Sequence, residues 1–189
     1  MQARALFLDR DGVININHGY VYQQSNFDFI DGIFDLARVA HLQHYNIVVV
    51  TNQAGIGRGY YSEQQFHEIA NWMCDKFNEQ GAPIAKVYFS PYHPTEGIGD
   101  YKLDDLSRKP HPGMIFQAQK DLNLDLNQSI LVGDKSSDIQ AGIAAGIKCN
   151  ILFGPIIPKD LMIDSCHLVQ SLTKVIPFLT SNRLGESLQ

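Results

Sequence analysis

The chain has 189 residues, 44% of them hydrophobic and 19% charged, and carries a formal net charge of −5. This length favours a single domain with a substantial core. The acidic balance argues against a broad basic surface for nucleic acid or an anionic membrane, and no apolar run approaches the ~18–20 residues of a membrane-spanning helix.

Five short apolar segments are predicted to be β-strands. They are rich in Val, Ile, Leu and Phe, a composition typical of strands buried on both faces of a sheet. In chain order they are residues 5–8, 47–50, 87–89, 130–132 and 150–153.

Amphipathic helices are predicted between and after these strands. The clearest starts at Ser62, which forms a capping-box pattern with Gln65, and runs to about Gln80 before Gly81 ends it. The others begin after Asp31, at Pro112 and after Ser136, and a last helix is expected over residues 168–179 with an interruption at Pro177.

The alternation of strands and helices predicts the α/β class: a three-layer, doubly wound, mostly parallel sheet. We expect one domain over residues 1–180 and a frayed tail over 181–189. Ligands of such sheets bind beyond the carboxyl ends of the strands, where the strand order reverses. Residues 90–109 have no periodicity, and an irregular segment of that length is usually functional.

Acidic residues follow two of the predicted strands. Asp9 and Asp11 stand at the exit of the first strand, and Asp134 follows the fourth. Taken singly, a hairpin turn or a helix cap explains each pattern. At one sheet edge, however, these carboxylates repel one another and call for a cation, and oxygen ligands of this kind suit Mg²⁺.

Two further segments have the character of phosphate sites. Thr51 precedes a glycine-rich run at residues 55–59, whose backbone N–H groups can cradle an anion. This run differs from the dinucleotide-binding fingerprint, because it follows the second strand and no helix is expected to begin at it directly. Arg108 and Lys109 precede a helix start, which favours anions. An ordinary polar turn and solvated cations are the alternative explanations.

These four segments, in this order, resemble the haloacid dehalogenase superfamily of phosphohydrolases. The shared motifs are Asp-x-Asp-Gly, a Thr after an apolar strand, a Lys, and Gly-Asp-x-x-x-Asp. The segments LFLDRDGVIN, NHGYV, VVVTNQAGIGRG, RKPHPGM and LVGDKSSDIQAG are similar to the heptose-1,7-bisphosphate phosphatase family, whose relatives are the histidinol-phosphate phosphatases. The resemblance covers nearly all of residues 4–153, and it implies a Rossmann-like fold without a large cap domain.

The resemblance also implies catalytic roles. Asp9 would be the nucleophile that forms an aspartyl-phosphate, and Asp11 the general acid and base. Mg²⁺ would be held by Asp9, the carbonyl of Asp11 and Asp134. The Thr51 hydroxyl, the Asn52 amide and Lys109 would bind the equatorial phosphate oxygens.

Substrate-binding residues follow from the same resemblance. Lys135 is expected to orient the carboxylates, and Asp138 is either an outer-shell partner or merely a helix-start charge. Arg108 is expected to recognise a second phosphate or the rest of the substrate. The remaining residues expected along the pocket rim are Asn17, His18, Gly19, Tyr20, Gln53 and Ala54.

One departure from the family concerns zinc. Family members commonly hold a structural zinc in the loop after the third strand, but here the corresponding positions are Ser90, Tyr92, Asp105 and Ser107, which offer no thiolate. We therefore expect no structural zinc; His93 with Asp104 or Asp105 is the alternative ligand set. Packing of Tyr92, Ile98, Tyr101 and Leu103 is expected to hold the loop instead.

The resemblance implies a Mg²⁺-dependent phosphatase of carbohydrate metabolism that removes the 7-phosphate of the heptose bisphosphate, as in lipopolysaccharide biosynthesis. The alternatives are a phosphatase for histidinol phosphate or another small sugar phosphate, and a nucleic-acid end-processing phosphatase, which the net charge disfavours. A degenerate phosphate-binding regulatory domain is the non-enzyme alternative, which the presence of both Asp9 and Asp11 disfavours.

Cysteine usage and the N-terminal sequence predict a cytoplasmic protein. Cys74, Cys149 and Cys166 are odd in number and far apart, so they fit neither a disulfide framework nor a close-spaced zinc site. No signal-peptide core precedes the first strand. We expect a small-molecule substrate, no nucleic-acid or membrane partner, and a monomer.

Overall fold

The computed structural model describes residues 2–181, and its centre is a six-stranded sheet in the order β3-β2-β1-β4-β5-β6. Every neighbouring pair of strands is parallel, as predicted. The chain moves outward from β1 to β3 and then returns to place β4 beside β1, so the strand order reverses between β1 and β4. The strands are β1 Arg4–Leu8, β2 Tyr45–Asn52, β3 Ile84–Ser90, β4 Ile130–Gly133, β5 Cys149–Phe153 and β6 His167–Val169.

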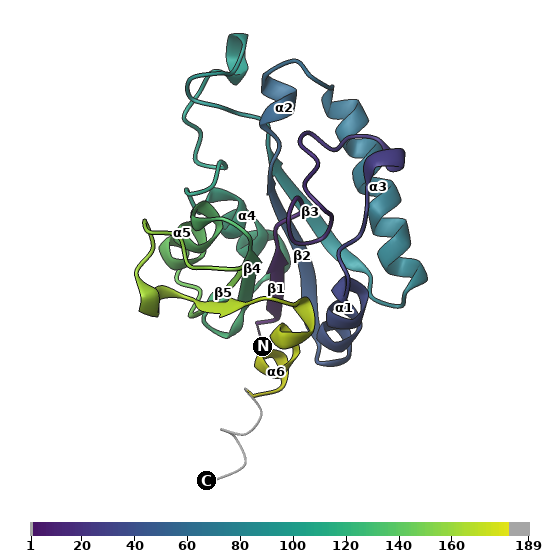
Figure 1. Ribbon diagram of the computed structural model, residues 1–189, viewed down its shortest axis with the longest axis vertical. Helices are drawn as coiled ribbons and strands as arrows, with labels where there is room; N and C mark the ends of the chain where they lie inside the picture. The colour runs from purple at the N-terminus through teal and green to yellow at the C-terminus, as the bar shows by residue number, and fades with distance from the viewer. Residues whose placement is uncertain (1, 182–189) are drawn as a thin grey trace.

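Helices cover both faces of this sheet (Figure 1). The helix after Ser62 has the predicted capping box, with Ser62 and Gln65 bonding each other's backbone N–H groups. The α-helices are α1 Ile33–Leu42, α2 Ala54–Gly57, α3 Glu63–Glu79, α4 Gly113–Leu122, α5 Ser136–Ala144 and α6 Ile176–Ser181, and 3-10 turns lie at Gln24–Asn26, Gly99–Tyr101, Leu126–Gln128, Ile163–Ser165 and Leu172–Val175.

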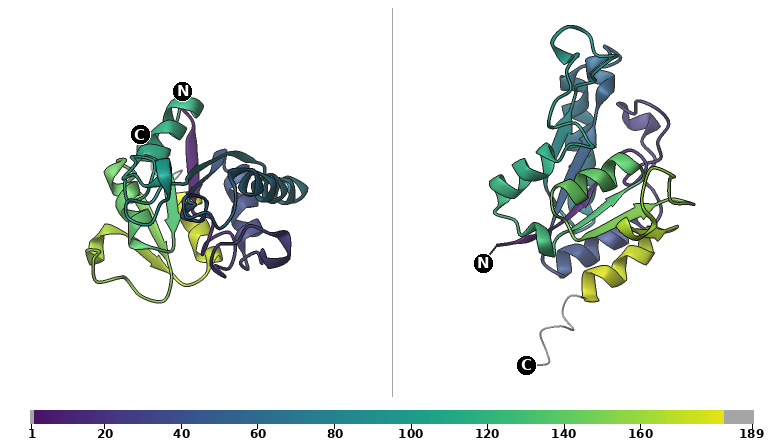
Figure 2. Two further views of the ribbon diagram at one scale, coloured as in Figure 1. Left: turned by 90° about the horizontal axis from the view of Figure 1, so that it is seen from above. Right: turned by 90° about the vertical axis from the view of Figure 1, so that its left-hand side faces the viewer.

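The core has two parts because successive strand residues point to opposite faces. Leu6 and Leu8 of β1 belong to the part shared with α1, α3 and the C-terminal segment. Ala5 and Phe7 belong to the part shared with α4 and α5. Figure 2 shows these helices on either side of the sheet, which confirms the predicted three layers.

The C-terminal prediction is partly wrong. The first part of the predicted helix over 168–179 is the short edge strand β6, paired with Ile151–Phe153 of β5. Leu172, Val175 and Leu179 produce the helical spacing and are fully buried, but they belong to a 3-10 turn and to α6. Pro177 lies in the first turn of α6, where its missing N–H does not interrupt the helix. Most of the predicted frayed tail, residues 182–189, lies outside the described residues.

Two loops, the loop after β1 and residues 91–112, lie over the carboxyl edge of the sheet in place of a separate cap domain. Residues 91–112 rise beside α2 in Figure 1, and Ile98 N–H donates to Gly57 carbonyl at 2.8 Å. The helix α2 begins at Ala54 and extends into the glycine-rich run, where no helix was predicted. A Cβ at Gly57 would lie 2.4 Å from the Pro91 carbonyl, so glycine permits this close approach of loop and helix. Among residues 2–181, no helix is long and apolar enough to span a bilayer.

The prediction of how this loop is held is only partly right. The rings of Tyr92 and Tyr101 lie 6.0 Å apart, and Tyr101 OH donates to Glu63. Ile98 and Leu103, however, are 65% and 48% exposed, so neither anchors the loop by burial. Hydrogen bonds to the neighbouring helices replace the packing that apolar side chains alone suggested.

Candidate active site

A cavity of about 600 Å³ opens at the carboxyl ends of β2, β1 and β4, and the strand order reverses between β1 and β4. Every residue predicted for the site lines this cavity except His18 and Asp134. Asp134 still lies next to Asp9, as described below. His18 does not reach the cavity, because its ring lies 2.8 Å from the exposed carboxylate of Asp28.

Asp9 directly follows β1, and one of its two carboxylate oxygens is hydrogen-bonded while the other is free to react. Its Oδ1 accepts hydrogen bonds from Arg10 N–H at 2.8 Å and from Lys109 Nζ at 2.9 Å. Within residues 2–181, Oδ2 accepts no hydrogen bond. The side chain is only 6% exposed, so Asp9 presents a fixed and poorly hydrated oxygen to the cavity.

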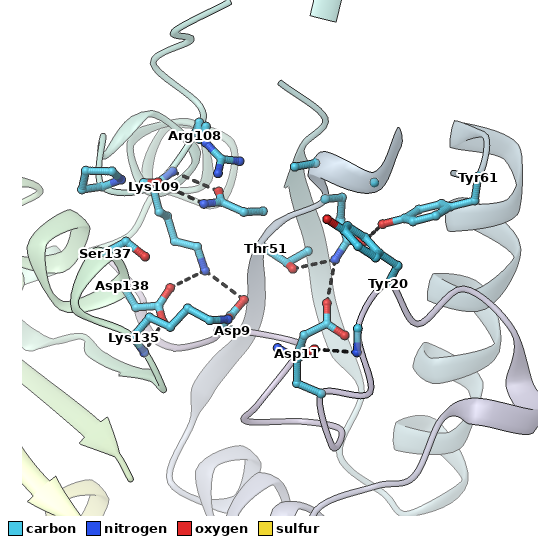
Figure 3. A pocket seen from close by; sticks show the side chains of 17 residues that line it. Asp9, Asp11, Tyr20, Thr51, Tyr61, Arg108, Lys109, Lys135, Ser137 and Asp138 are labelled. Carbon is cyan, nitrogen blue, oxygen red and sulfur yellow. Dashed lines mark hydrogen bonds and ion pairs between the residues drawn. The ribbon is translucent and has the colours of Figure 1, made fainter. Parts of the chain in front are cut away.

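Lys109 is a buried cation enclosed by three oxygens, two of which, from Asp9 and Asp138, are seen in Figure 3. Its Nζ lies 2.9 Å from Asp9 Oδ1 and 2.6 Å from Asp138 Oδ1, and it donates to the Val50 carbonyl at 2.7 Å. Burial alone lowers the pKa of Lys109, but the charges of Asp138 and Asp9 outweigh burial and raise it above its ordinary value. All three N–H groups of the Lys109 ammonium therefore face protein oxygens. Lys109 thus fixes the position of the Asp9 carboxylate and offsets its negative charge.

Asp138 is the counterion of Lys109 rather than a merely solvated charge at a helix start. It is 2% exposed, and while Oδ1 faces Lys109, Oδ2 accepts from Lys135 N–H at 2.9 Å. A Cβ at Gly133 would lie 2.2 Å from the Asp138 Cβ, so this glycine allows α5 to approach the end of β4.

Asp134 completes an acidic cluster that is suited to a cation. Ligand atoms of Asp9, Asp134 and Asp138 all lie within 4.8 Å of one another. Oδ1 of Asp134 is buried and accepts no hydrogen bond from the described residues, and its nearest cation is Lys135 Nζ at 3.5 Å. Burial, and then the charge of Asp9, raise the pKa of Asp134 to about 7. A buried carboxylate oxygen that accepts no hydrogen bond in this way fits a bound Mg²⁺.

The Asp-Gly turn brings Asp134 close to the first strand. Gly12 has a backbone φ of +103°, a conformation that residues other than glycine rarely adopt. A Cβ at this position would lie 2.2 Å from Asp134 Oδ2. Because both strain and contact would exclude a side chain, Gly12 leaves the space in which the carboxylates of Asp9 and Asp134 meet.

Asp11 points away from this acidic cluster. Arg10 donates to both oxygens of Asp11, and Asn15 Nδ2 and Gln53 Nε2 add hydrogen bonds at 3.1 and 3.0 Å. Arg10 is 1% exposed and also donates to the Val21 carbonyl. The carboxylate is thus held by donors on one side of the cavity, which leaves its main-chain carbonyl as the group that could join a metal site.

Gln53 lies at the base of the cavity rather than at its rim. It is 2% exposed, and its Nε2 donates to Asp11 Oδ2 and, at 2.8 Å, to Thr51 Oγ. Its Oε1 accepts from the hydroxyl of Tyr61. Since Thr51 Oγ already accepts one hydrogen bond, its own proton is available for a ligand oxygen.

The mouth of the cavity carries cations and aromatic rings. Arg108 donates to the Tyr92 carbonyl at 3.0 Å, and burial followed by the charge of Arg58 lowers the pKa of Arg108. Arg58 donates to the hydroxyl of Tyr20 and forms an ion pair with Glu96. Arg58, at the end of α2, thereby links the loop after β1 to the long loop over the sheet edge.

Three of the four positions that the family resemblance relates to a zinc site bond to one another. Ser107 Oγ donates to Ser90 Oγ at 3.0 Å, and Ser107 N–H donates to Asp105 Oδ1 at 2.8 Å. The alternative ligand set does not come together either, since Asp104 pairs with His111 and the Nδ1 atom of His93 accepts from N–H groups within its own turn. A hydrogen bond therefore joins the two ends of this loop.

Sequence reasoning did not single out three residues that the structure places around the predicted ones. Arg10 stands between the two motif aspartates. Successive side chains of an extended strand point to opposite faces, so the side chain of Arg10 is expected to point away from that of Asp9, and this alternation is the sequence signal for its burial. Asn15 and Tyr61 contact Asp11 and Gln53 from loops, which carry no periodic pattern.

The fold and the cavity together define a hydrolase of the haloacid dehalogenase type, and comparisons with known proteins agree. A family model described as HAD-hydrolase-like matches residues 106–152. A D-glycero-alpha-D-manno-heptose-1,7-bisphosphate 7-phosphatase from Burkholderia mallei is 53% identical over 180 residues, 95% of each chain. A D-glycero-beta-D-manno-heptose-1,7-bisphosphate 7-phosphatase from Haemophilus influenzae is 49% identical over 149 residues, 79% of this chain and 80% of that one.

Solved structures agree on the fold. A structure from Mesorhizobium loti described as a HAD-like phosphatase has a TM-score of 0.86 at 31% identity, covering 94% of this chain and 86% of that one. The D,D-heptose 1,7-bisphosphate phosphatase from B. bronchiseptica, complexed with magnesium and phosphate, has a TM-score of 0.78 at 22% identity, covering 97% and 99%. With full-length relatives at this identity, the chain belongs to the family of the D-glycero-D-manno-heptose-1,7-bisphosphate 7-phosphatases.

Proposed function

We propose that this chain removes the 7-phosphate of D-glycero-D-manno-heptose 1,7-bisphosphate through an aspartyl-phosphate on Asp9. The observation that carries the proposal is the available Oδ2 of Asp9, fixed by Lys109 and facing a cavity of about 600 Å³. This volume suits a small ligand with two charged groups. The full-length likeness to 7-phosphatases supports the choice of substrate.

In the first step Asp9 Oδ2 attacks phosphorus while the bond to the sugar oxygen breaks. Lys109 holds the other oxygen of Asp9 at 2.9 Å and so directs Oδ2 toward the cavity. The Thr51 hydroxyl donates to a phosphate oxygen, where charge is stabilised during the transfer. Forming the aspartyl-phosphate divides one difficult displacement into two easier steps.

Asp11 is proposed to move the protons of both steps. It protonates the departing sugar oxygen and then takes a proton from the water that hydrolyses the aspartyl-phosphate. The carboxylate of Asp11 accepts from Gln53 Nε2, whereas Figure 3 shows Lys109 directed toward Asp9 and Asp138. The acid and the cation therefore approach the reacting phosphate from different sides.

Asp9, Asp134 and the main-chain carbonyl of Asp11 are the groups proposed to hold Mg²⁺. When bound, Mg²⁺ supplies positive charge that reduces the repulsion between Asp9 and the phosphate. The unpartnered Oδ1 of Asp134 supports this assignment. The magnesium and phosphate in the structurally similar B. bronchiseptica protein support it as well.

The rest of the substrate is proposed to meet the mouth of the cavity. Arg108 is proposed to bind the anionic group that is not transferred, and Asn17 and Tyr20 line the same cavity. Lys135 lies 3.5 Å from Asp134 and is proposed to orient the carboxylates. A small sugar phosphate is the one partner that this chemistry requires. A monomeric state and a cytoplasmic location remain predictions.

The test is hydrolysis of the alpha and beta anomers of heptose 1,7-bisphosphate and of histidinol phosphate with saturating Mg²⁺. We expect release of the 7-phosphate from heptose bisphosphate and at least ~10-fold lower kcat/KM for histidinol phosphate. Asp9→Asn is expected to retain the fold and lose turnover, because an amide cannot attack phosphorus. A preference for histidinol phosphate would refute the proposed substrate, and a tenth of the wild-type rate in Asp9→Asn would refute the nucleophile.

A further inference from the structure

The side-chain amide of Gln53 lies between the acid–base residue and the phosphate-binding hydroxyl. Its Nε2 atom donates to Asp11 Oδ2 at 3.0 Å and to Thr51 Oγ at 2.8 Å. Its Oε1 atom accepts from the hydroxyl of Tyr61. One amide group thus contacts two residues with different proposed tasks, Asp11 and Thr51, and Tyr61 contacts the oxygen of that amide; Figure 3 labels these three residues.

Only one orientation of this amide is compatible with its neighbours. If the amide turned by half a rotation, Oε1 would face the carboxylate of Asp11, and two acceptors would then oppose each other. The same rotation would remove the hydrogen bond that Thr51 Oγ accepts, and with it the reason for the Thr51 proton to point toward a ligand. Burial raises the pKa of Tyr61 above its ordinary value, so its hydroxyl keeps the proton that it donates to Oε1.

Tyr61 is itself rigidly mounted. Its ring is 5% exposed and stacks on Tyr22 with centroids 5.1 Å apart and an interplanar angle of 11°. A Cβ at Gly55 would lie 2.2 Å from Tyr61 Cε1, so the backbone of α2 runs directly against the ring. Ser62, the next residue, is fixed by the capping box of α3. The hydroxyl is therefore held at one place.

We propose that Tyr61 is a positioning residue for phosphoryl transfer: by donating to Gln53 Oε1 it fixes the amide so that its two N–H groups hold Asp11 and Thr51. The proposal rests on the phosphatase function proposed above. Tyr61 acts through Gln53, and removing its hydroxyl frees the amide to rotate. Both the proton transfer by Asp11 and the hydrogen bond from Thr51 then lose their fixed geometry, while the ring contacts remain.

The test compares Tyr61→Phe, Gln53→Met and the double variant, with Tyr22→Phe as the matched control. Tyr22 belongs to the same stack, but its hydroxyl does not bond to Gln53. The substrates are glycerol phosphate and p-nitrophenyl phosphate with saturating Mg²⁺. We expect kcat/KM of Tyr61→Phe to fall about tenfold, near the upper range for one lost neutral hydrogen bond, and that of Tyr22→Phe to stay within about twofold.

The double variant distinguishes a positioning role from a structural one. If Tyr61 acts through Gln53, adding Tyr61→Phe to Gln53→Met lowers kcat/KM no further, because the group that it orients is already gone. The loss is expected to be larger for glycerol phosphate, whose poor leaving group needs the Asp11 proton, than for p-nitrophenyl phosphate. Gln53→Glu, which still accepts from Tyr61 but cannot donate to Asp11, is expected to lose as much as Gln53→Met.

Wild-type activity in Tyr61→Phe, or a second full loss in the double variant, would overturn the proposal. Thermal unfolding of each variant identifies any loss that comes from a melted fold, and kcat/KM is therefore compared at a temperature at which every variant is folded. Failure of the proposed function gives a different result. If heptose bisphosphate is not hydrolysed but the two simple esters are, the substrate assignment fails and the role of Tyr61 is still measured.

Discussion

The side chain of Asn52 forms two hydrogen bonds with the backbone of Lys109, one in each direction. Asn52 Nδ2 donates to the Lys109 carbonyl, and Lys109 N–H donates to Asn52 Oδ1, both at 3.0 Å. The two residues are 57 positions apart in sequence. Because the backbone of Lys109 is fixed to the end of β2, its ammonium group reaches Asp9 and Asp138 in a defined geometry.

Replacing Asn52 is therefore expected to weaken catalysis without a change in the reacting groups. Asn52→Ala removes both hydrogen bonds and lets the backbone of Lys109 shift away from Asp9. Two lost hydrogen bonds of about 1 kcal/mol each predict a fall in kcat/KM of about 10–100-fold. The measurement is steady-state kinetics with p-nitrophenyl phosphate, and Asn78→Ala, on the exposed side of α3, is the control. Unchanged kcat/KM in Asn52→Ala would show that Lys109 does not depend on this contact.

Arg108→Ala is expected to discriminate between substrates. Arg108 lines the mouth of the cavity, whereas Lys109 contacts Asp9, so Arg108 should act on the part of the substrate that is not transferred. Loss of a charged hydrogen bond of about 1.5–3 kcal/mol predicts a fall in kcat/KM of about 10–100-fold for heptose bisphosphate. For p-nitrophenyl phosphate the expected change is within about twofold. Equal losses on both substrates would place Arg108 in the catalytic machinery instead.

The effect of Mg²⁺ on stability should depend on pH through Asp134. In the metal-free protein the folded state keeps the Asp134 proton up to about pH 7, whereas the unfolded chain releases it near the ordinary pKa of 3.8. Between these values the folded state binds more protons, so this group makes the free energy of unfolding fall as pH rises. Mg²⁺ binds the ionised carboxylate, so the metal should raise the melting temperature more at pH 8 than at pH 5.

This pH dependence can be measured by thermal unfolding with and without Mg²⁺. Asp134→Asn removes the titrating group and should abolish most of the difference between the two pH values. Asp121→Asn is the control, because Asp121 pairs with Lys86 outside the cavity. A Mg²⁺ effect that is equal at pH 5 and pH 8 would argue against Asp134 as a ligand.

The purified protein is expected to contain no stoichiometric zinc. Ser90 and Ser107 bond to each other and offer no thiolate, and structural zinc sites need four closed N or S ligands. Treatment with a chelator followed by excess Mg²⁺ should restore full activity. Elemental analysis checks the metal content directly. About one zinc per chain, retained through dialysis, would point to His93 and the neighbouring aspartates.

The sequence by itself determined the alternation of strands and helices and the main site residues. Strand runs such as residues 47–50 and the capping box of Ser62 and Gln65 are local patterns, and local patterns suffice to predict elements. Asp9, Asp11 and Thr51 stand at predicted strand ends, which parallel strands present at one edge, and Lys109 precedes a predicted helix start. Their catalytic roles were implied by the family resemblance. Once those elements were predicted, the position of the cavity followed from topology alone.

Only the tertiary structure decided which partners hold these residues. β6 is a three-residue strand, too short for a periodic pattern, and pairing with β5 defines it. Whether His18 meets the cavity or Asp28 depends on a loop without regular structure. Tyr61 reaches Gln53, and Arg10 is buried against Asp11, through contacts that depend on how α3 and the loop after β1 pack together. Such contacts depend on the packing of distant segments, and no local periodicity encodes them.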